Sequence, residues 1–193
     1  MDLDWKVIIS TLVGGAITFA ATTGQEMLRN RRVRRATMLS VGAEIAAGLD
    51  IARARGWAKD VEDCIEQAMQ GRVVRLTILL PKETIPSCRA ALAQGALGDG
   101  ELTGLVTCFV IAVDGLKADL DRLFEYDFDS PRCMVSADDP EHAVKLYVEM
   151  LGLLIAIENF GADAIALAAK RLGRKGKWLR EKFERLAAPE TLR

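Results

Sequence analysis

The feature that most constrains this chain is an uncharged apolar run near its start. Residues 7–23 read VIISTLVGGAITFAATT and contain no ionisable side chain over 17 positions. That length lies at the short end of what a bilayer core requires. The apolar residues contribute about 2 to 4 kcal/mol on an insertion scale, and the hydroxyl residues and glycines take part of that back. We predict a transmembrane helix over residues 7–24, with a buried helix of a soluble protein as the alternative.

The residues on either side of this run predict its orientation. Asp2 and Asp4 precede it, and five arginines follow it closely: Arg29, Arg31, Arg32, Arg34 and Arg35. Because basic residues accumulate on the cytoplasmic side of a span, we expect the N-terminus outside and the rest of the chain in the cytoplasm. A cleaved signal peptide would have a positive leader and no basic cluster directly downstream. Trp5 stands where interfacial indoles are common. These features predict a single-pass membrane protein whose C-terminal domain lies in the cytoplasm.

Small residues recur along one face of the predicted span. Ser10, Gly14, Thr18 and Thr22 follow one another at four-residue steps. Such faces let two helix backbones approach closely within lipid. The pattern therefore predicts self-association of the span into a homo-oligomer. A span that is merely rich in small residues remains the alternative.

The charge of the chain is segregated along its length, although the net charge is only −1. Residues 36–169 carry 11 basic and 21 acidic side chains, and residues 170–193 carry nine basic and three acidic ones. Half of the residues are hydrophobic, and alanine and leucine recur throughout, which favours helices. The chain after the span is long enough for one domain with a core of its own.

Helical periodicity predicts an all-α fold, in which the transmembrane helix continues into a cytoplasmic bundle of about four to five helices. We divide the chain into a short extracytoplasmic N-terminus (1–6), the span (7–24), the bundle (25–172) and a basic amphipathic C-terminal helix with its tail (173–193). Residues 72–80 are ambiguous between a strand, a short helix and an extended segment. We expect the anchor to run on into a long helix that ends near residue 56. Further helices are expected over residues 57–69, 84–94, 101–126 and 139–172.

The helix predicted over 139–172 is apolar almost all round at MLGLLIAI, which is typical of the central helix of a bundle. One helix start is indicated by Asp139, Pro140 and Glu141. Another is indicated by Asp99 and Glu101, within the glycine-rich stretch 95–104. That stretch has the spacing of neither a P-loop nor a dinucleotide fingerprint. Glu158 follows the apolar turn, and we expect it either to pair with an arginine or to face solvent.

The C-terminal helix combines basic and apolar side chains. This pattern predicts contact with an anionic membrane surface. Packing of the helix onto the bundle is the alternative, and binding to nucleic acid is disfavoured because the preceding arginine cluster already places the chain at a membrane. The residues predicted to contact the membrane surface, besides Trp5 and the five arginines, are Lys177, Trp178, Arg180, Lys182, Phe183 and Arg185.

The chain offers little for catalysis or metal binding. His142 is the one histidine, and its acidic neighbours Asp138, Asp139 and Glu141 lack the ordered spacing of a calcium loop. The four cysteines are widely spaced, which argues against a zinc site and fits a reducing cytoplasm. We predict no catalytic residue, no cofactor and no metal site, and expect a protein that is not an enzyme.

The span, the RNRRVRR cluster and the helix entry GALGDGELTGLVTCF together resemble, in layout, small bacterial single-span membrane proteins with a cytoplasmic helical domain of uncharacterised function. The resemblance covers the whole chain and implies no functional residue. We expect a membrane-anchored interaction or scaffold protein that self-associates at the inner face of the membrane and holds an unknown protein partner. The alternative that the resemblance implies is an oligomeric pore-forming or membrane-disrupting effector, for example in phage defence, and a membrane-tethered enzyme comes third.

Overall fold

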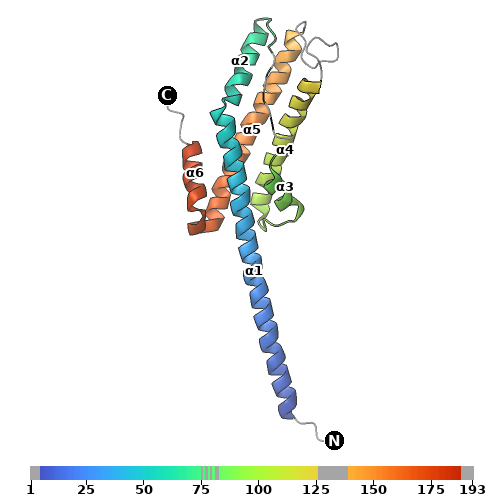
Figure 1. Cartoon of the computed structure of the whole chain (residues 1–193), viewed down its shortest axis with the longest axis vertical. Coiled ribbons are helices and arrows are strands. Elements are labelled where there is room, and N and C mark those ends of the chain that lie inside the picture. Colours follow the sequence, from blue (N-terminus) through green and yellow to red (C-terminus); the bar gives the residue numbers. More distant parts are fainter. Residues whose placement is uncertain are drawn as a thin grey trace. The chain divides into compact units, whose positions relative to one another are not determined.

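The computed structural model describes residues 5–74, 76, 78, 80, 83–125 and 139–187, without the side chains of residues 5–20, 122, 124, 125 and 187. Within these ranges the chain is helical and contains no strand, so the predicted all-α fold is confirmed. Figure 1 shows the helices. Their bounds are α1 Trp5–Ala54, α2 Trp57–Met69, α3 Pro86–Ala93, α4 Gly100–Glu125, α5 Pro140–Leu172, the short 3₁₀ helix η1 Gly173–Gly176 and α6 Lys177–Ala187.

The chain divides into two compact units, Met1–Ala36 and Thr37–Arg193. Helix α1 contributes residues to both. The first unit consists of the start of α1, and its residues 25–36 are all exposed. The second unit is a bundle with a continuous hydrophobic core.

Two helix starts in the bundle form as their sequences predict. The Asp99 carboxylate accepts a hydrogen bond from the Leu102 amide at 3.0 Å at the start of α4. The Asp139 carboxylate accepts one from the His142 amide at 3.0 Å at the start of α5, where Pro140 occupies the first turn. These carboxylates satisfy amide groups that have no partner inside the helix and lie at the positive end of its dipole.

Helix α5 is the central helix of the bundle and packs against α4, α2 and α6 (Figure 1). Its apolar side chains recur at three- and four-residue steps on the side that faces these neighbours, as expected for a core helix. The prediction that this helix is central is therefore confirmed. Its buried residues are Ala143, Leu146, Tyr147, Met150, Leu154, Ile157, Gly161, Ala164, Ile165, Ala168, Ala169 and Leu172.

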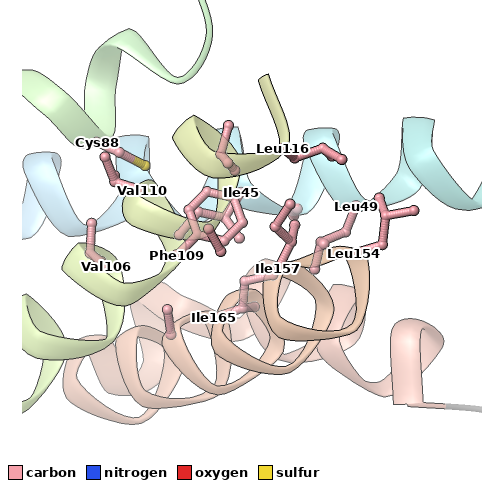
Figure 2. Packing of buried hydrophobic residues seen from close by; sticks show 14 of the residues in the cluster. Ile45, Leu49, Cys88, Val106, Phe109, Val110, Leu116, Leu154, Ile157 and Ile165 are labelled. Atoms are coloured by element: carbon pink, nitrogen blue, oxygen red, sulfur yellow. The ribbon is translucent and has the colours of Figure 1, made fainter. Parts of the chain in front are cut away.

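Gly161 lets α1 and α4 approach α5 closely. A methyl group added to Gly161 would lie 3.0 Å from Ile45, 3.1 Å from Leu49 and 3.2 Å from Phe109. Figure 2 shows Ile45 and Phe109 packed together beside Ile157 of α5. Three helices therefore meet at one glycine, because any larger residue there would push their side chains apart.

Residues 72–74, 76, 78 and 80 of the ambiguous stretch have neither helical nor strand structure. Leu76 and Ile78 are buried, and the Val74 carbonyl accepts a hydrogen bond from the Tyr147 hydroxyl of α5 at 2.6 Å. The segment thus covers the bundle core without a partner strand among the described residues. Of the alternatives for this stretch, a cover segment without helix or strand agrees with the structure at the described residues.

One helical stretch among the residues searched, Pro140–Leu186, is long and apolar enough to cross a membrane by length and composition. The central helix of a soluble bundle has the same properties, and α5 occupies that position here. Only 28% of its most apolar window is buried, so α5 also leaves apolar surface uncovered. Most of the span predicted over residues 7–24 lies outside the described side chains.

We expect Gly161→Leu to lower the free energy of unfolding by about 1 to 3 kcal/mol, because the new side chain overpacks the junction of α1, α4 and α5. Gly48→Leu is the matched control, since Gly48 is exposed on α1 and an added methyl group would meet nothing within 4 Å. It should raise the stability by about 0.5 to 1 kcal/mol through helix propensity. Urea denaturation of the full chain in detergent compares the two. Equal effects would contradict the close packing at Gly161.

Candidate functional site

The bundle contains a groove of about 560 Å³ where α1 ends and α2 begins, beside α5 and the end of α6. Core residues form its base, namely Leu49 of α1 and Leu154 and Ile157 of α5. Trp57 and the half-exposed Ile155 also line it. The groove is therefore apolar at its base and open to solvent.

A glycine turn shapes the groove. Gly56 has φ 66°, in the left-handed region that favours glycine, and its amide donates to the Arg53 carbonyl at 2.9 Å. The chain turns there, and α2 begins at the next residue, Trp57, and runs on in the same general direction as the end of α1 (Figure 1). This turn places the indole of Trp57 and the side chain of Arg53 on the same groove.

Arg53 joins three helices across the groove. Its guanidinium donates to the Glu158 carboxylate on α5 and to the Leu186 carbonyl on α6. The side chains of Arg53 and Glu158 are 30% and 45% exposed, so water screens their attraction in part. Glu158 is thus both the partner of an arginine and partly solvated, which combines the two alternatives that its sequence position allowed.

Two further contacts hold α6 on the bundle. Lys182 pairs with Asp50 of α1, and Leu179 is fully buried against Gly42, where an added methyl group would lie 2.8 Å from the leucine. Leu186 is buried as well. The apolar side of α6 therefore faces the bundle, which is the alternative that the sequence left open for this helix.

The residues predicted to contact a membrane surface have different environments. On α6, Lys177, Arg180 and Arg185 are exposed and Trp178 is 44% exposed, whereas Phe183 packs against the core and Lys182 is paired with Asp50. In the first unit, all five arginines are exposed on α1: Arg29, Arg31, Arg32, Arg34 and Arg35.

The residues of the predicted span are described only in part. Thr22 is exposed. The side chains of Trp5, Ser10, Gly14 and Thr18 lie outside the described residues, so self-association through this face stays a prediction. The acidic stretch of sequence before Asp139, with Asp138, also lies outside them.

Glu44 caps α3 and stands beside a buried thiol. Its two carboxylate oxygens accept hydrogen bonds from the Ser87 amide at 3.0 Å and the Cys88 amide at 2.8 Å. Burial, together with the Glu44 carboxylate, raises the pKa of the Cys88 thiol far above its ordinary value. A thiol with so little thiolate at neutral pH is inert, so this arrangement is structural.

Titratable groups do not gather into a metal site among the residues that the structure describes. The charged residues of the groove are Arg53, Lys59, Glu62 and Glu158. Sequence reasoning missed Arg53 because it stands among several arginines of an amphipathic helix. The signal that could have found it is Glu158, an acid directly after an apolar turn.

Comparison of the chain with protein-family models, with curated proteins and with solved structures found no match.

We expect Arg53→Met to lower the free energy of unfolding by about 1 kcal/mol, because Glu158 and the Leu186 carbonyl lose a shared, partly exposed donor. It should also speed the cleavage of α6 by trypsin at Arg180 and Arg185. Arg55→Met is the matched control, since Arg55 is exposed two residues further along and does not line the groove. Its effect should stay below about 0.5 kcal/mol. Indistinguishable digestion of the two variants would contradict the role of Arg53 in holding α6.

Proposed function

We propose that this chain is a membrane-anchored helical scaffold, which self-associates at the inner face of a bacterial cytoplasmic membrane and holds a protein partner there. The predicted span 7–24 supplies the anchor and the bundle supplies the partner site. The arginines that follow the span lie at the cytoplasmic headgroups, and each adds about 1 kcal/mol of attraction to an anionic leaflet.

The observation that carries the anchor is the exposure of α1 before the bundle. Residues 25–36 are exposed on all sides of the helix, including Met27 at 61%, Leu28 at 57% and Val33 at 51%. Most helical stability in proteins comes from packing of an apolar face, and this part of α1 has no core of its own. Insertion of the directly preceding apolar run into a bilayer would hold the helix in place.

The groove supports the scaffold part of the proposal. Its apolar base with a few charged groups has the composition of sites that hold an amphipathic helix by its apolar face. Arg53 and Glu158 lie within it, and Lys59 and Glu62 also line it. Charges of both signs suit the polar edges of such a helix, so we assign the groove to an amphipathic helix of a protein partner.

A pore-forming or membrane-disrupting effector is the second candidate, and the composition of α5 favours it. This helix is apolar enough to cross a membrane and is buried only in part within the bundle. In this second candidate α5 would leave the bundle and insert into the bilayer. Expression of the chain would then cause ion leakage, whereas a scaffold should leave the membrane tight.

We expect a reporter that is active only in the cytoplasm to function when it is fused after Arg193. Replacing all five arginines of residues 29–35 with glutamine should scramble the orientation, because the charge bias is lost. Replacing the same five with lysine is the matched control and should preserve it. Activity of a periplasm-only reporter after Arg193 in the unmodified chain would contradict the proposed orientation.

A further inference from the structure

The turn between α5 and α6 concentrates positive charge on one part of the bundle. Residues 170–177 read KRLGRKGK and contain five basic side chains and no acidic one. Arg171 is paired with Asp99 and Glu101 at the start of α4. The other four basic side chains are exposed, and we call them the basic turn: Lys170, Arg174, Lys175 and Lys177.

The basic turn is not neutralised within the bundle. Lys177 lies 3.6 Å from the Glu181 carboxylate, but both side chains are more than half exposed, so water screens their attraction. Lys170, Arg174 and Lys175 have no acidic partner among the residues that the structure describes. The four charges therefore repel one another unless an anion from outside the chain lies among them.

Helix dipoles do not explain this charge. A cation near the C-terminus of a helix is favourable, which accounts for Lys170 in the last turn of α5. Arg174 and Lys175 lie in η1, and Lys177 begins α6, whose first turn contains no acidic residue. Cations at the N-terminal end of a helix oppose its dipole. The dipoles therefore account for one of the four charges, and the other three favour a ligand outside the chain.

The contacts of α6 place the basic turn at one end of the bundle. Helix α6 meets α1 at three successive points: Leu179 at Gly42, Lys182 at Asp50 and Leu186 at Arg53. Because the residue numbers rise together along both helices, α6 runs parallel to α1. The turn that precedes α6 therefore lies at the end of the bundle where α1 enters it, near Thr37 (Figure 1). We call this the entry end.

A short length of helix tethers the entry end to the predicted span. Helix α1 is continuous from Trp5 to Ala54. About 13 helical residues separate the end of the predicted span at residue 24 from the start of the bundle at residue 37, which is about 20 Å at 1.5 Å per residue. Helix α5 has 33 residues, so its other end lies about 50 Å from the basic turn. The tether therefore confines the basic turn, rather than the opposite end, to the neighbourhood of the bilayer.

Trp178 follows the basic turn directly and is 44% exposed. An exposed indole beside basic side chains is typical of a membrane interface, where the ring meets the headgroup level and the cations meet phosphates. The apolar side of α6 is not available to lipid, because Leu179 and Leu186 are buried and Phe183 packs against the core. Contact with a membrane is thus limited to the turn, whereas the sequence predicted it along the whole of α6.

We propose that the basic turn and Trp178 bind the phosphate headgroups of anionic lipids and hold the entry end of the bundle against the cytoplasmic leaflet. The inference rests on the proposed function, since it takes residues 7–24 as the anchor. Anchoring raises the effective concentration of headgroups around the turn, which lets four exposed cations suffice. The groove at the end of α1 lies about 25 Å further along that helix, so this contact leaves it open to a partner in the cytoplasm.

The test uses the full chain in lipid nanodiscs that contain brominated phosphatidylcholine, which quenches a tryptophan that reaches the lipid. Trp5 and Trp57 are replaced by phenylalanine, so that Trp178 is the one emitter. We expect quenching of Trp178 to be at least about twofold stronger when the discs also contain phosphatidylglycerol, and high salt should abolish this difference by screening. Equal quenching with and without phosphatidylglycerol would overturn the inference.

Two matched variants separate the basic turn from the overall charge of the bundle. Replacing the four residues of the basic turn with glutamine should remove the effect of phosphatidylglycerol on Trp178. The control variant changes the net charge equally and should keep that effect, because its four substitutions to glutamine lie on exposed cations away from the turn: Arg55, Lys59, Arg72 and Lys145. Equal loss in both variants would reveal a general attraction of charge and refute the assignment to the turn.

Further arms identify the source of the phosphate and separate this inference from the proposed function. In discs of phosphatidylcholine alone, neither excess inorganic phosphate nor a duplex oligonucleotide should shift the emission of Trp178. A saturable shift with either would assign the turn to free phosphate or to nucleic acid and overturn the inference. If the chain enters the discs and phosphatidylglycerol has no effect, the inference alone is refuted. If the chain does not enter the discs, the anchor of the proposed function fails as well.

Discussion

The close approach of α1 and α4 to α5 at Gly161 is the constraint on which the rest of the bundle depends. One missing side chain lets Ile45, Leu49 and Phe109 share a single space in the core. Because interiors are packed as densely as organic crystals, this junction fixes which faces of the three helices are buried. The outward face of α5 and the groove beside α2 are left uncovered by this junction.

Charged side chains near the ends of the helices also hold neighbouring helices together around this apolar core. Arg171 near the end of α5 pairs with Asp99 at the start of α4, with 2.7 Å between nitrogen and oxygen. Arg53 of α1 donates a hydrogen bond to the Leu186 carbonyl of α6, and Lys182 of α6 pairs with Asp50 of α1. Arg171 and Lys182 of the basic C-terminal stretch are thus neutralised by acids of the bundle.

The sequence predicts much of this fold because the decisive patterns are local. The helix starts at Asp99 and Asp139 need only a carboxylate in front of a free amide, and the apolar run of α5 indicates its central place. The sequence left the docking of α6 open, because it depends on Gly42 of α1 and on Arg53, whose acceptor carbonyl on α6 lies 133 residues away along the chain. Residues 72–80 were undecided because a short apolar run has no distinct period.

The central claim is that α5 belongs to the core of the bundle while the membrane is met by the N-terminal part of α1. Hydrogen exchange of the full chain in lipid nanodiscs, compared with detergent, tests it most directly. The account predicts that peptides covering residues 150–165 exchange slowly and alike in both, since their protection comes from packing. Peptides covering residues 7–24 should exchange slowly inside the lipid disc. Protection of residues 150–165 that appears only with lipid, together with fast exchange of residues 7–24, would contradict the account.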